Sequence, residues 1–142
     1  MKTISATTAV AAALAAASAA SAEPVPLTVV VDGVEARGGA LYVSVQTEAD
    51  YMKPTGTEGS VIEGPRPGTH ALDYEVEPGV YAVTVWHDDD ANGRFDAGPS
   101  GMPLDGWALS GTVTGGAPTF EDAKVTVGED GASTTVRMTY GR

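Results

Sequence analysis

The chain has 142 residues, no cysteine, and 8 basic against 19 acidic residues, which gives a formal net charge of −11 at pH 7. An excess this acidic disfavours nucleic acid and anionic lipid as partners, because like charges repel. The lack of cysteine excludes disulfides, thiol nucleophiles and thiolate metal sites, so packing alone must stabilise the core.

The first 22 residues have the pattern of a cleaved signal peptide. An apolar, alanine-rich stretch follows Lys2, and Ala20 and Ala22 supply the small residues that a signal peptidase accepts. The stretch is shorter than the roughly 20 residues of a membrane-spanning helix, and no later stretch is long and apolar enough, so no membrane span is predicted. The alternative is an N-terminal helix of the folded domain. We expect export to the periplasm or the extracellular space, with residues 23–142 as the mature domain.

The sequence of the mature chain has the pattern of short strands separated by turns. Residues 27–31 and 40–46, on either side of Gly38-Gly39, predict an opening hairpin. The segment 48–69 is rich in proline and glycine, which predicts a loop with one short edge strand at 60–63. An alternating strand is expected at 70–76. The segment 80–87 is apolar on both parities and predicts a central strand.

The second half of the chain continues this pattern. An acidic loop over residues 88–100 precedes a short strand within 107–113 and two further strands at 120–127 and 133–140, and no helix is expected. About seven strands predict an all-β, single-domain β-sandwich of immunoglobulin-like or prealbumin-like type. Tyr81, after the Pro78-Gly79 turn, stands where a tyrosine corner would return its hydroxyl to the turn; the alternative is an ordinary core aromatic.

The acidic loop is the sharpest chemical feature. From Asp88 it reads D-x-D-x-N-G-x-x-D, the first nine positions of a calcium-loop pattern. In such a loop, short side chains that carry oxygen atoms point toward one common position. A Ca²⁺ ion at that position would reduce the repulsion among the carboxylates. The predicted calcium ligands are Asp88, Asp90, Asn92, Arg94 through its backbone carbonyl, and Asp96.

Two observations limit the calcium prediction. The position of the bidentate glutamate of an EF-hand is Pro99, and a strand precedes Asp88, so the loop is not an EF-hand. Aspartate, asparagine and glycine also form turns, and a rigid metal-free turn is the alternative. His87 has core-facing parity, and we expect it to bond the loop backbone; a transition-metal or catalytic role is its alternative. His70 is expected at the surface.

Three motifs carry a family resemblance. Residues 79–83 (GVYAV) run into 87–96 (HDDDANGRFD), and 101–110 (GMPLDGWALS) and 118–123 (PTFEDA) follow. Together they resemble DUF2141, a family of exported bacterial proteins of unknown function, over about residues 27–140. Asp105 and Ala108 depart from the usual glutamate and glycine. The resemblance implies export and a β-sandwich-like domain. Asp105 is a candidate further ligand or cap of the acidic loop; alternatively, Pro103 and Trp107 simply pack over the end of the sandwich.

The sequence predicts a binding or structural module and not an enzyme, because no catalytic constellation is readable. Its expected partners are an envelope protein or a polysaccharide. One alternative is an accessory subunit of an envelope complex, held through an exposed sheet edge. The other is a hydrolase of envelope polymers that uses two of the acidic residues Asp88, Asp90, Asp96 and Asp105.

Overall fold

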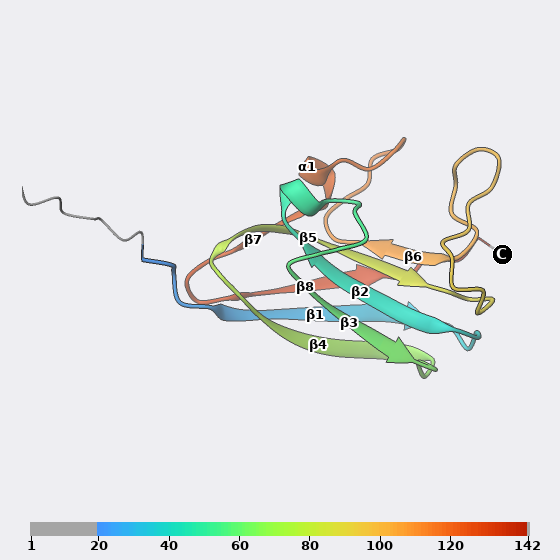
Figure 1. Cartoon of the computed structure of the whole chain (residues 1–142), viewed down its shortest axis with the longest axis horizontal. Coiled ribbons are helices and arrows are strands. Elements are labelled where there is room, and N and C mark those ends of the chain that lie inside the picture. Colours follow the sequence, from blue (N-terminus) through green and yellow to red (C-terminus); the bar gives the residue numbers. More distant parts are fainter. Residues whose placement is uncertain (1–19, 142) are drawn as a thin grey trace, which may run out of the picture.

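The computed structural model describes residues 20–141 (Figure 1). Almost all of the predicted signal peptide therefore lies outside the described residues. The described part is mostly β, with eight strands in two sheets, which confirms the predicted all-β class and is consistent with a sandwich. Among these residues, no helix is long and apolar enough to cross a membrane.

The smaller sheet has the order β4-β1-β8. Its central strand β1 (Val25–Val34) runs antiparallel to β4 (Gly68–Val76) and parallel to β8 (Ala132–Arg137). Alternate residues of β1 are fully buried, as expected for a strand with one face on a core.

The larger sheet has the order β3-β2-β5-β6, with β7 also on β5. It consists of β2 (Ala40–Gln46), β3 (Glu58–Glu63), β5 (Gly79–His87), β6 (Gly106–Leu109) and β7 (Lys124–Val127). The two short strands β7 and β6 pair with the first and second halves of β5. With β2 on its other side, β5 is the central strand that its apolar sequence predicts.

The core lies between the sheets, because the inward residues of both belong to one apolar cluster. The largest contributions come from β1, β2 and β5, whose side chains in the cluster are Leu27, Val29, Val31, Val34, Leu41, Val43, Val45, Tyr81, Val83 and Val85. Tyr81 makes the predicted tyrosine corner: its ring is buried, and its hydroxyl donates to the Glu77 carbonyl over 2.8 Å. The ring thus fixes the turn that starts β5.

Two local predictions are wrong. Residues 27–31 and 40–46 do not form a hairpin, because β1 and β2 belong to different sheets. The glycines between them mark a change of direction, but the hydrogen-bond partners of β1 come from distant β4 and β8.

The predicted strand at 120–127 is also half wrong. It begins with a one-turn helix, α1 (Phe120–Ala123), and only its second half is β7. Thr119 accepts a hydrogen bond from the Asp122 backbone while the Asp122 carboxylate accepts from the Thr119 backbone, which makes a capping box. A second short helical turn, η1 (Glu48–Asp50), lies in the proline- and glycine-rich segment.

Candidate functional site

The acidic loop connects β5 to β6 and lies at one end of the larger sheet (Figure 1). Its two arms are held together by an antiparallel bridge between Ala97 and Pro103 and by a hydrogen bond from the Leu104 amide to the Asp96 carbonyl, 2.9 Å. These contacts bring Asp105, at the start of β6, beside the first part of the loop.

Asp88 organises the backbone of the loop. It is buried, and its two carboxylate oxygens accept from the amides of Asn92 (3.1 Å) and Gly93 (2.9 Å). The chain turns there through left-handed conformations, with φ of 59° at Ala91 and 75° at Gly93. Asp88 is therefore an internal brace of the turn.

The Gly38-Gly39 turn supports the loop from beneath. Gly39 has φ of 75°, and a side chain there would place its Cβ 1.7 Å from the Asp88 carbonyl oxygen. The Asp88 amide in turn donates to the Ala40 carbonyl over 3.0 Å. The close approach requires glycine, which explains that residue in the connection from β1 to β2.

Three carboxylates converge above this brace. Asp90, Asp96 and Asp105 each offer one oxygen, and these oxygens lie within 4.8 Å of one another. Their exposure grades from Asp90 at the surface, through half-buried Asp96, to fully buried Asp105. The cluster joins the first part of the loop to the residue that immediately precedes β6.

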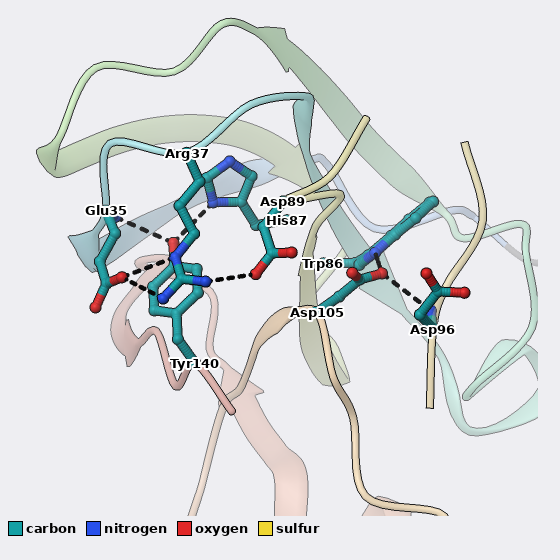
Figure 2. A network of polar contacts seen from close by, with 8 residues as sticks. All are labelled: Glu35, Arg37, Trp86, His87, Asp89, Asp96, Asp105 and Tyr140. Carbon is teal, nitrogen blue, oxygen red and sulfur yellow. Dashed lines mark hydrogen bonds and ion pairs between the residues drawn. The ribbon is translucent and has the colours of Figure 1, made fainter. Parts of the chain in front are cut away.

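Asp105 is the unusual member of the cluster (Figure 2). One oxygen accepts from the Trp86 indole over 2.8 Å and from the Asp96 amide over 3.0 Å. The other oxygen, Oδ1, is buried and has no hydrogen-bond partner among the described residues. A buried carboxylate oxygen without a partner is costly, because it loses its water and gains nothing in exchange.

Asn92 lies between the two outer carboxylates. Its amide nitrogen donates to Asp90 over 3.1 Å and to Asp96, while its side-chain oxygen accepts from the Arg94 amide over 2.8 Å. The Asn92 amide group thus offsets part of the repulsion between Asp90 and Asp96.

The structure therefore places only some of the predicted calcium ligands in the carboxylate cluster. It brings Asp90 and Asp96 together and adds Asp105, the residue considered as a further ligand on the 101–110 motif. Asp88 braces the turn, the Asn92 side-chain oxygen is engaged with backbone, and Arg94 is exposed. Three carboxylates, one of them on the buried Asp105, fit a hard cation such as Ca²⁺.

A second polar network begins one residue before the loop (Figure 2). His87 is fully buried, and its Nδ1 lies 2.7 Å from the Tyr140 hydroxyl, so this bond goes to the C-terminal segment and not to the loop backbone as expected. Arg37 stacks over the Tyr140 ring at 4.6 Å and pairs with Asp89 at 3.0 Å. Burial lowers the pKa of His87, an effect that the charge of Asp89 partly opposes.

The buried Ser110 has a structural role. Its hydroxyl accepts from the Val83 amide over 2.8 Å and donates to the Ala123 carbonyl. It connects β5 to the end of α1 where β6 has ended. His70, predicted at the surface, is partly exposed and lies with Nε2 2.7 Å from the Arg66 carbonyl.

Comparisons with curated proteins and with solved structures found no match. A family model described as an uncharacterized protein conserved in bacteria, DUF2141, matches residues 29–136. The match runs from the middle of β1 to the end of β8 and includes the acidic loop and all three carboxylates of the cluster. It covers most of the chain, and the protein belongs to the DUF2141 family.

Proposed function

We propose that this protein is an exported binding module, not an enzyme, whose acidic loop is fixed by one Ca²⁺ held between Asp90, Asp96 and Asp105. The observation that carries the proposal is the buried carboxylate of Asp105, which belongs to a cluster of three carboxylates and whose Oδ1 has no hydrogen-bond partner among the described residues. A cation would neutralise the cluster, and bidentate binding by Asp105 would also give that oxygen a partner.

The surroundings of the cluster favour a structural use of the ion. Asp105 also holds the Trp86 indole and the Asp96 amide, so an ion on Asp105 would fix a strand side chain and the loop together. Asp90 and Asp96 would supply the other two negatively charged ligands. Loop carbonyls and water would be the further ligands that Ca²⁺ takes. The leader-like first 22 residues support export to the periplasm or outside the cell, where the loop would present a rigid recognition surface.

The test is calorimetric titration of the metal-stripped protein with Ca²⁺ and with Mg²⁺, together with melting curves in Ca²⁺ and in EDTA. We expect heat on Ca²⁺ addition and a melting temperature that rises with Ca²⁺ concentration, since an ion that binds only the folded state stabilises it. Asp130→Asn, in an exposed turn, is the control and should behave as wild type. No heat and no melting shift at millimolar Ca²⁺ contradicts the proposal.

A second candidate role is that of an accessory subunit of an envelope complex. It is favoured by β3, which ends the larger sheet and pairs with β2 alone among the described strands. Such an edge accepts a strand from a partner. Size-exclusion chromatography of the protein from its native source tests this role, and elution as a monomer counts against it.

A further inference from the structure

The outer face of the larger sheet carries a row of apolar and aromatic side chains. Val61, Tyr42, Trp86 and Trp107 are successive cross-strand partners on β3, β2, β5 and β6. Their neighbours Val43, Val85 and Ala108 are buried in the core, so the row faces away from it. With strands about 4.8 Å apart, the row extends over roughly 14 Å.

The rings at the centre of this row are held in place. Tyr42 and Trp86 stack with centroids 4.5 Å apart and an interplanar angle of 14°. Phe95 of the acidic loop meets Trp86 edge-on at 6.2 Å, and Asp105 accepts from the Trp86 indole. Because Trp86 covers one face of Tyr42, the other face is turned toward β3.

Tyr42, which is partly exposed, borders an open groove of about 410 Å³ over β2 and β3. Segment 54–57 forms one wall of the groove and Val61, which is 55% exposed, contributes to its floor. Hydroxyl groups line it on Ser44 and Thr55 as well as on other residues of β3 and the wall. The wall is tied to β2, since the Gln46 amide donates to the Lys53 carbonyl over 2.9 Å.

Charge in the groove is sparse for a chain this acidic. Glu58 is its one charged lining residue, and no lysine or arginine lines it. A phosphate or uronate polymer would therefore meet no cation there and would be repelled by the chain's charge of −11. A second copy of the chain would be repelled for the same reason.

We propose that this groove binds an uncharged polysaccharide, with the face of Tyr42 packing against a sugar ring. Sugar rings present C–H groups to the negative face of an aromatic ring, and their hydroxyls match Ser44 and Thr55. Because the groove is open, it would contact one side of an extended sugar chain and would not enclose a small ligand. This inference rests on the binding role proposed above, names its ligand class, and does not require the ion.

The test is affinity electrophoresis of the protein in gels that contain hydroxyethyl cellulose, mixed-linkage β-glucan, dextran or galactomannan, with alginate as the anionic arm. We expect retardation by at least one neutral polymer and none by alginate. Tyr42→Leu keeps apolar bulk but removes the ring face, and should weaken binding about five- to tenfold. Val113→Ala removes exposed apolar bulk outside the groove, in neither the ring stack nor the acidic loop, and should bind as wild type.

Three results overturn the assignment: no retardation by any of the four neutral polymers, retardation by alginate alone, or equal losses in Tyr42→Leu and Val113→Ala. If Tyr42→Leu does not fold, Thr55→Val provides the same test, because Thr55 is exposed and lines the groove. Each gel is run in Ca²⁺ and in EDTA. Retardation in both buffers together with no heat in the calcium titration rejects the metal and keeps the groove, whereas calcium heat without retardation does the reverse.

Discussion

Replacing Asp105 by asparagine separates a metal site from a metal-free turn. Asparagine retains one side-chain oxygen that can accept from the Trp86 indole and the Asp96 amide, and it adds an amide that can donate to a neighbouring carboxylate. It removes one negative charge from a group whose oxygens lie within 4.8 Å of one another. The substitution therefore acts on charge much more than on shape.

The magnitude follows from the geometry. Two unit charges at that separation repel by about 3.5 kcal/mol at an effective dielectric constant of ~20, and the exposure of Asp90 reduces the net gain to roughly 1 kcal/mol. In EDTA, Asp105→Asn should therefore melt about 4 °C above wild type. In Ca²⁺ at about 100 times the dissociation constant, wild type gains about 2.7 kcal/mol, or roughly 10 °C, and the variant gains little.

The order of the two melting temperatures thus reverses between EDTA and Ca²⁺. Differential scanning calorimetry of wild type, Asp105→Asn and the surface control Asp130→Asn measures it. If Asp105→Asn melts below wild type by the same amount in both buffers, Asp105 is only the acceptor for Trp86 and the loop amide. The reasoning from its unpartnered oxygen is then refuted.

Three further predictions concern the supports of the site. Gly39→Ala should destabilise the fold by at least about 2 kcal/mol more than Gly64→Ala in urea unfolding, because both have positive φ but only Gly39 meets the Asp88 carbonyl; equal losses would contradict the close approach. Because burial lowers the pKa of His87, the folded state binds fewer protons than the unfolded one, so stability should fall as pH drops below about 6.5. His87→Gln should flatten that part of the melting-temperature profile, and an unchanged slope would count against it. Thr119→Ala should cost about 1 kcal/mol in chemical unfolding through loss of the α1 cap, and a loss below 0.3 kcal/mol, on the order of a surface substitution, would show that the cap contributes little.

Several features of the fold were predictable because they depend on neighbours in the chain. The alternation of β4, the apolar run of β5 and the turn before Tyr81 are local patterns, and each is found where the sequence places it. The capping box at Thr119 is also a local signal, since it needs only a threonine followed three residues later by an acidic residue. The sequence of 120–127 predicts a single strand, but the capped first half is the helical turn α1.

Which strands pair with one another, and which carboxylates form the cluster, depends on the tertiary structure. Turn residues show where the chain reverses, but strands pair with whichever edges the two-sheet core leaves available, which is why β1 pairs with β4 and β8 and not with β2. The calcium-loop spacing located Asp90 and Asp96. The spacing could not show that backbone amides occupy both oxygens of Asp88.

The sequence by itself determined a β-rich, cysteine-free, acidic chain with one Asp-rich loop after its most apolar strand, because these properties reside in composition and local periodicity. Only the tertiary structure decided that Asp105, nine residues beyond Asp96, is desolvated beside it with one oxygen unpartnered. The burial of Asp105 and its approach to Asp96 depend on contacts between segments that are distant in the sequence. The register of β5 with β6 and the return of the loop across the sheet end produce both.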